Sequence, residues 1–329
     1  MERREFITLL GGAAAAWPLA ARAQQSALRR LGVEMLYEKG NNEGKMLLAA
    51  FQDALAKLGW SDGENIRIEV YWTGNDPGRI QEATSKLVAS WPDVIVSSGS
   101  ATTLSLLQET RTIPIVFAQV VDPVAQGFVA SLSRPAGNAT GLANFEPSMA
   151  GKWVELLKEL FPHMTRVAIP FNPASAPYAD IYLRSFRSNA PSFGVAVVAP
   201  AVADLSALEN FCAAQLRDPA IGIIPMPSSF VTGHIDEVAT IMLRHHLPSL
   251  YTIRAYAEAG GSLSYGNDIN DNFRKAAVFV DKILNRREPG DLPVQFPTKF
   301  DLAVNLKTVR NLGLTVPPSL LATADEVIE

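Results

Sequence analysis

The chain has 329 residues, of which 48% are hydrophobic and 19% are charged, and its formal net charge is −4. This is a globular composition with enough apolar material for two cores, so it excludes a disordered or fibrous chain. The acidic balance argues against binding to nucleic acid and against docking on anionic lipid. The single cysteine, Cys212, cannot form an internal disulfide, and we expect it on a helix at a position that faces the protein core.

The first 23 residues have the pattern of a cleaved export signal. A charged start, Arg3-Arg4-Glu5, precedes an apolar run over 7–19, and Ala21-Arg22-Ala23 supplies the small residues of a cleavage site. Gly11-Gly12 and Trp17-Pro18 would break the alternative structure, an amphipathic first helix. The paired arginines predict export by the twin-arginine route. We therefore expect residues 1–23 to be removed and the mature chain to reside in the periplasm without a membrane span.

From residue 28 onward, short apolar runs alternate with helical spacings in two successive series. The first series predicts strands at 31–36, 66–72, 94–96 and 115–117 and helices at 46–58, 80–90 and 101–110. The second predicts helices at 149–161, 178–189, 205–216 and 235–245 and strands at 166–169, 195–198, 221–224 and 250–251. Strict alternation predicts an α/β fold of two Rossmann-like lobes, each with a parallel sheet covered on both faces. Residues 134–141 are expected to form a loop that crosses between the lobes.

The sequence lacks the motifs HExxH, CxxC, GxSxG and GxGxxG. Gly40 to Lys45 is similar to a phosphate loop, but it has one residue too few between its glycines, and Met46 replaces the hydroxyl that would hold magnesium. His245 and His246 are adjacent and would point about 100° apart on a helix, so they cannot share a metal. The sequence therefore predicts no catalytic residues, no metal site and no cofactor.

Polar residues gather where the predicted strands end, which is the edge of a doubly wound sheet that binds ligands. The strand at 94–96 runs into Ser98, Gly99, Ser100 and Thr102 at a helix start, whose unpaired N–H groups attract a carboxylate. We expect one serine to cap this helix, and the others either pack or contact the ligand.

Other candidates at the same edge are Asp122, which either pairs with a ligand amine or caps a turn, and six further residues at or near strand ends. These six are Asn172, Pro227, Ser228, Tyr251, Tyr265 and Tyr37. The set contains one carboxylate and no cation, so it cannot neutralise a doubly charged ligand. It predicts a monocarboxylate or neutral organic solute with an aromatic or compact apolar part.

Several segments are similar to those of one known family. They are the leader from Arg3 to Gly12, 113–117, 121–124, 134–141, 259–266, 297–300 and 305–308, so they extend over essentially the whole chain. They resemble ABC-transporter substrate-binding proteins whose characterised members take tryptophan and related aromatic solutes. The resemblance implies a type I periplasmic-binding fold, with three crossovers and the ligand in the cleft. Related sequences tend to carry Pro-Asp where this chain has Pro227-Ser228, and the missing carboxylate favours a ligand without an amine.

We therefore expect an extracytoplasmic solute-binding component that presents its ligand to the permease and ATPase of an ABC importer. The alternatives are a two-lobed ligand sensor with a signalling partner and a secreted enzyme. We expect residues 28–141 with 264–296 in the first lobe, 142–263 in the second, and the 297–329 tail near the hinge. The hinge strands are expected near Gly141, Ser264 and Phe296.

Overall fold

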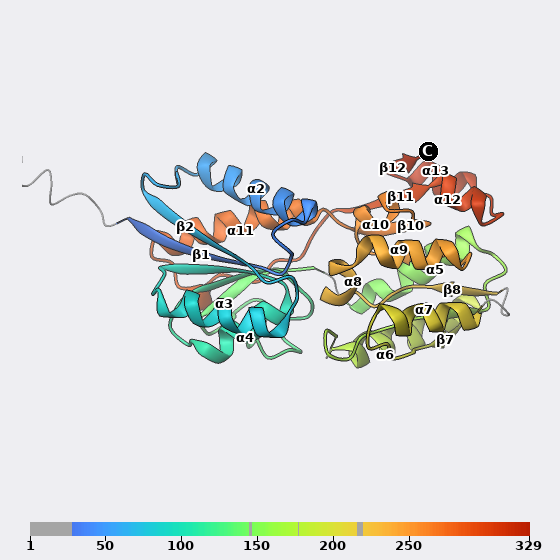
Figure 1. Cartoon of the computed structure of the whole chain (residues 1–329), viewed down its shortest axis with the longest axis horizontal. Helices are drawn as coiled ribbons and strands as arrows, with labels where there is room; N and C mark the ends of the chain where they lie inside the picture. The colour runs from blue at the N-terminus through green and yellow to red at the C-terminus, as the bar shows by residue number, and fades with distance from the viewer. Residues whose placement is uncertain (1–27, 145–146, 177, 216–219) are drawn as a thin grey trace, which may run out of the picture.

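A computed structural model describes residues 28–144, 147–176, 178–215 and 220–329, which form two lobes side by side (Figure 1). The expected export signal, residues 1–23, lies outside the described residues. None of the helices within these ranges is long and apolar enough to cross a membrane.

The first lobe is a five-stranded parallel sheet with helices on both faces. Its strand order is β2 (Ile66–Trp72), β1 (Arg29–Met35), β3 (Val94–Ser98), β4 (Ile115–Val120) and β5 (Ala139–Ala143). Helices α2 (Asn42–Lys57) and α11 (Ile269–Leu284) cover one face, while α3 (Pro77–Ala89) and α4 (Ser100–Glu109) cover the other (Figure 1). Every residue of β3 and β4 is buried, because these central strands are covered on both sides.

The second lobe has two small sheets. An isolated β-bridge between Ile223 and Ser249 connects them. The first sheet has the order β7 (Ala196–Val198), β6 (Arg166–Ala168) and β8 (Ile221–Ile223). The second has the order β9 (Leu250–Tyr251), β10 (Leu263–Asn267), β11 (Phe300–Asn305) and β12 (Glu326–Ile328). Only the β10–β11 pair among these described pairs is antiparallel.

The helices of the second lobe pack around these strands. They are α5 (Ala150–Leu160), α6 (Ala179–Asn189), α7 (Leu205–Ala214), α8 (Ser229–Gly233), α9 (Ile235–Arg244), α10 (Arg254–Glu258), α12 (Leu306–Asn311) and α13 (Pro318–Thr323). Short 3₁₀ turns lie at Pro147–Met149 and Ala190–Phe193, and a third, Pro289–Asp291, packs against β5 of the first lobe. Trp153 of α5 is fully buried and stacks on Tyr182 of α6 at a ring-centroid distance of 6.2 Å. This stacked pair anchors the helices that cover one face of the lobe.

The chain passes between the lobes three times: between β5 and α5, between β10 and α11, and between α11 and β11. The first and third passages lie side by side, since Gln295 N donates to Gly141 O at 3.0 Å and Ala143 N donates to Gln295 O at 3.0 Å. A Cβ atom at Gly141 would approach the carbonyl oxygen of Phe117 to 2.0 Å. Only glycine therefore permits this close packing of β5 against β4.

The α/β fold with parallel sheets is confirmed, and two boundaries differ from the expectation. Residues 139–141, expected in a loop, begin β5 because their backbone pairs with β4. Residues 264–267 belong to the second lobe, because β10 pairs there with β9 and β11, so the chain crosses only after Asn267. The tail, expected near the hinge, leaves the third passage at Phe300 and forms β11, α12, α13 and the edge strand β12 of the second lobe (Figure 1).

Candidate ligand site between the lobes

The start of α4 presents backbone N–H groups at the inner edge of the first lobe. The helix follows β3 through Gly99, which has a φ of 97° and is the N-cap without any side-chain hydrogen bond. We expected a serine cap, and that expectation was wrong, because Ser98 Oγ donates instead to Gln119 Oε1 at 3.1 Å. Uncapped N–H groups at the positive end of a helix are suited to hold a carboxylate.

Gln119 shapes the adjacent wall. It has a φ of 60° within β4, where the pairing with β5 shifts register, and this places its amide beside the helix start. Its Nε2 donates to the hydroxyl of Tyr37 at 3.1 Å. Burial raises the pKa of Tyr37 well above its ordinary value, so the phenol stays protonated. Tyr37 and Ser98 therefore hold Gln119 in place from behind and do not face the ligand space.

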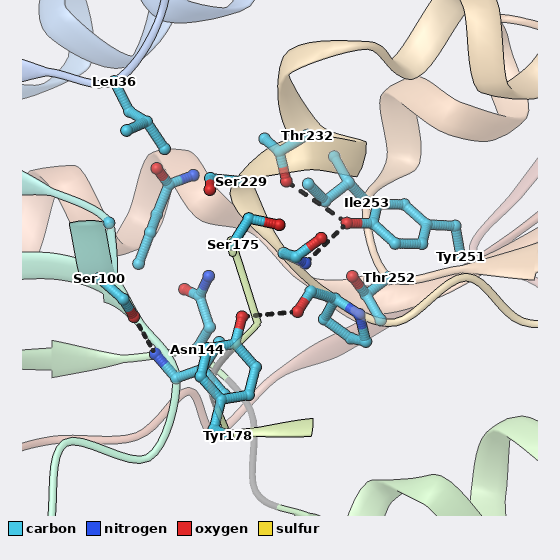
Figure 2. A pocket seen from close by; sticks show the side chains of 15 residues that line it. Leu36, Ser100, Asn144, Ser175, Tyr178, Ser229, Thr232, Tyr251, Thr252 and Ile253 are labelled. Atoms are coloured by element: carbon cyan, nitrogen blue, oxygen red, sulfur yellow. Dashed lines mark hydrogen bonds between the residues drawn. The ribbon is translucent and has the colours of Figure 1, made fainter. Parts of the chain in front are cut away.

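A cavity of about 40 Å³ lies between this edge and the second lobe (Figure 2). The wall on the side of the first lobe comprises Leu36, Gly99, Ser100, Gln119, Val121 and Asn144. The opposite wall comprises Ser175, Tyr178, Pro227, Ser228, Ser229, Thr232, Tyr251, Thr252 and Ile253. All of these described lining residues are uncharged, and hydroxyl or amide groups alternate with apolar surface.

Ser100 has a hydroxyl proton to offer. Its Oγ accepts from Gln126 Nε2 at 3.0 Å and from Val121 N at 3.4 Å. A serine oxygen accepts up to two hydrogen bonds and donates one, so the two contacts leave the donor unused. The Ser100 hydroxyl is thus poised to donate to an acceptor in the cavity (Figure 2).

Two tyrosines form the far wall. Tyr178 donates to the carbonyl of Pro227 at 2.7 Å, which leaves its ring as an apolar surface. The hydroxyl of Tyr251 makes only long contacts, 3.4 Å to Thr232 Oγ1 and 3.5 Å to Ser228 N. Burial raises the pKa of Tyr251 to about 12, so its hydroxyl is neutral and can donate or accept. Next to it, the buried Oγ1 of Thr252 has no hydrogen-bond partner within the described chain.

The cavity brings together Gly99, Ser100, Pro227, Ser228 and Tyr251 of the eleven candidate residues. Ser228 also caps α8, since its Oγ accepts from Val231 N at 3.5 Å. These five came from the ends of three different predicted strands, which supports the reasoning from strand ends.

The other candidates do not line this cavity, although Asn172 lines a neighbouring pocket, and local contacts engage most of their polar groups. Thr102 Oγ1 donates to the carbonyl of Ser98 at 2.9 Å inside the helix. Asp122 Oδ1 accepts from Ala125 N at 3.0 Å and closes a turn. Asn172 donates to Ala203 O at 2.7 Å and accepts from Ala174 N at 2.9 Å. Tyr265 lies within β10 and stacks on Phe300 in the second lobe at 5.9 Å. Turn chemistry therefore explains Asp122 and Asn172.

The sequence reasoning missed several lining residues. Gln119 lies two residues beyond the predicted strand at 115–117 and Thr252 follows Tyr251, so the strand-end rule could have included both. Asn144, Ser175 and Tyr178 reach the cavity through the crossover and the loop before α6, and no local pattern marks such positions.

The arrangement is suited to binding. Neutral donors and acceptors surround the space, and no group of three or more His, Cys, Asp or Glu residues in the described chain could hold a metal ion. The helix start offers partial positive charge for one carboxylate, and the tyrosine rings offer apolar contact.

Comparison with known proteins agrees with this geometry. A family model described as "ABC transporter substrate binding protein" matches residues 44–328. The chain is 24% identical to a tyrosine-binding protein of Clostridioides difficile over 264 residues, which are 80% of this chain and 75% of the relative.

Two solved structures share the fold. A conserved domain protein from Vibrio cholerae is 25% identical with a TM-score of 0.83, and the match covers 91% of this chain and 99% of that one. An ABC domain in complex with L-Trp from Streptococcus pneumonia is 22% identical with a TM-score of 0.84, and covers 92% of this chain and 100% of that one. Because the family model matches most of its length, this chain belongs to the ABC transporter substrate-binding protein family.

Proposed function

We propose that this protein captures a small organic solute between its lobes outside the cytoplasm and delivers it to the permease and ATPase of an ABC importer. The observation that carries this proposal is the uncharged cavity with walls from both lobes, next to the open N-terminus of α4. A solute that contacts both walls favours the closed arrangement, because only there are all its contacts made. The protein acts by binding and release, without catalysis.

The solute is a monocarboxylate or a neutral molecule with an aromatic or compact apolar part. One negative charge is matched by the N–H groups at the start of α4, whereas the described walls supply no lysine or arginine for a second charge. The tyrosine-binding relative supports an aromatic solute. A buried ammonium has no carboxylate to face in these walls, so an aromatic acid fits them better than an amino acid does.

A ligand screen followed by calorimetry tests the proposal. Melting temperatures of the mature protein are measured against amino acids, aromatic acids and neutral solutes, since a ligand of the folded state raises apparent stability. The best ligand is then titrated into Tyr251→Phe and into the matched variant Tyr265→Phe. We expect Tyr251→Phe to weaken binding by about 0.5–1.5 kcal/mol, because it removes one neutral hydrogen bond to the solute. We expect the affinity of Tyr265→Phe to equal that of the wild type. A screen in which no small solute raises the melting temperature contradicts the proposal.

We further propose that residues 1–23 direct export by the twin-arginine route. The double variant Arg3→Lys and Arg4→Lys then accumulates precursor in the cytoplasm. Mass spectrometry of the exported wild-type protein finds Gln24 at the N-terminus, and an exported protein that retains Met1 would contradict cleavage.

A further inference from the structure

A second pocket adjoins the cavity on the outer side of α4. It has a volume of about 380 Å³ and shares Ser100, Ser175 and Ser229 with the cavity, so the two spaces adjoin at these three serines. We call it the outer pocket. Like the cavity, it takes its walls from both lobes: α3 and α4 on one side, the loop after β6 and the start of α8 on the other.

The cavity alone is too small for the solute. An engineered apolar cavity on the order of 150 Å³ binds benzene, whereas this one has a volume of about 40 Å³. An aromatic solute whose carboxylate is at the start of α4 must therefore place its ring beyond the cavity. The outer pocket is the space that adjoins Ser100 and Ala101, the first two residues of that helix.

The walls of the outer pocket suit an uncharged, partly apolar body. Ile80 and Leu104 on the first lobe face Phe230 on the second, and Leu104 is 44% exposed although it is a large apolar side chain. Amide side chains surround this apolar surface, among them Gln81 and Gln108, and every described residue of the lining is uncharged. An apolar ligand group that buries such a surface binds favourably, whereas a charged group would be buried there without a partner.

One polar group in the outer pocket lacks a partner. Ser105 of α4 lines the pocket, is 8% exposed, and its Oγ has no hydrogen-bond partner among the described residues. A buried hydroxyl without a partner carries a desolvation cost that a ligand group can relieve. Ser105 lies five residues beyond Ser100, which is about 7.5 Å along the helix axis at about 1.5 Å per residue.

From these observations we propose that the outer pocket is a subsite for the body of an elongated aromatic monocarboxylate. Its carboxylate binds at the start of α4, its ring lies against Leu104, and a neutral hydroxyl or amide at its far end bonds to Ser105. The proposal rests on the proposed function and deepens it by setting the length of the solute.

Calorimetry with four acids tests the subsite: phenylacetate, 3-phenylpropanoate, 4-phenylbutanoate and 4-(4-hydroxyphenyl)butanoate. The expected result is that 4-phenylbutanoate binds at least tenfold more tightly than phenylacetate and that the 4-hydroxy compound binds more tightly still. Leu104→Asp lowers affinity for the two long acids at least tenfold and that for phenylacetate, whose shorter chain carries its ring less far along α4, by a smaller factor. Leu132→Asp is the same substitution at an exposed leucine outside both pockets, and it leaves the affinities for the acids unchanged.

Ser105→Ala separates the polar contact from packing. It removes the advantage of the 4-hydroxy compound and leaves binding of 4-phenylbutanoate within twofold. Equal affinities along the series, or equal effects of Leu104→Asp on short and long acids, overturn the subsite while binding of phenylacetate still supports the proposed function. If none of the four acids binds, the subsite is also overturned, and the ligand screen alone then decides the proposed function.

Discussion

The side-chain amide of Asn272 donates a hydrogen bond of 2.9 Å to the side-chain oxygen of Asn144. Asn144 follows β5 at the first crossover and lines the cavity, and Asn272 lies in the first turn of α11, after the second crossover. Their exposed fractions are 7% and 1%, so water does not replace this bond. It therefore joins two interlobe crossovers directly beside the ligand space.

Asn272→Leu should destabilise the protein and weaken solute binding. The substitution leaves Asn144 Oδ1 buried without its partner, which costs about 1–3 kcal/mol of the free energy of unfolding. Urea denaturation measures this loss. Asn285→Leu, at the exposed end of the same helix, is the control and should cost much less. Equal losses in the two variants would show that the bond to Asn144 is not special.

Ser100→Ala should weaken binding of a carboxylate ligand by about 0.5–1.5 kcal/mol, or about 1.5–3 kcal/mol if the bond is to the charged group itself. The reason is the hydroxyl proton that its contacts with Gln126 and Val121 leave unused. Calorimetry measures the change, with Ser206→Ala near the start of α7 as the control. Unchanged affinity in Ser100→Ala would remove this hydroxyl from the site.

Asp122→Asn should leave affinity within twofold of the wild type. The carboxylate oxygen of Asp122 caps the turn at Ala125 and lies outside the cavity, and asparagine retains that acceptor. Asparagine also tolerates the φ of 41° at this position. If calorimetry instead shows a loss of 2 kcal/mol or more, about the effect of unpairing a buried charge, the ligand carries an amine that Asp122 binds.

The stability of the first lobe should depend on the protonation of Glu34. This glutamate of β1 is fully buried, and burial raises its pKa from 4.5 to about 8, although the hydroxyl of Thr84 donates to it at 3.2 Å. The folded state thus binds a proton more tightly than the unfolded state. The contribution of Glu34 to the free energy of unfolding is therefore fully present below pH 4.5. It is lost as the pH rises to about 8, by at most about 1.4 kcal/mol per pH unit.

Glu34→Gln should remove that part of the pH dependence, because glutamine stays neutral. Urea denaturation of both proteins between pH 5 and pH 9 measures the difference in slope. Parallel curves for wild type and variant would show that Glu34 is not protonated in the folded protein near neutral pH.

The strand and helix series could be predicted from sequence because apolar spacing records which faces are covered. Ile66–Trp72 alternates and is β2 at its expected limits, and Val94 to Val96 is apolar throughout and forms central β3. The local sequence of a strand does not show which other strand it pairs with. The placement of Leu263–Asn267 in the second lobe depends on strands distant in sequence, so residues 264–267 were assigned to the wrong lobe.

A third of the residues that line the cavity could be predicted for a similar reason. Strand ends locate Ser100 and Tyr251, since parallel strands end at a common edge. Whether a polar side chain there faces the ligand or its own backbone depends on rotamer and turn geometry. Asp122, Asn172 and Thr102 have suitable chemistry, but nearby backbone groups engage them.

The most direct test of the central claim is the position of a bound solute in a crystal structure of the mature protein with the tightest ligand from the screen. We expect a solute in contact with both lobes, with its carboxylate or most polar group within hydrogen-bond distance of the start of α4 and of Ser100. Its apolar part should lie beside α4, between the two lobes. A solute that contacts one lobe only, or that binds away from Ser100 and Tyr251, would contradict the account.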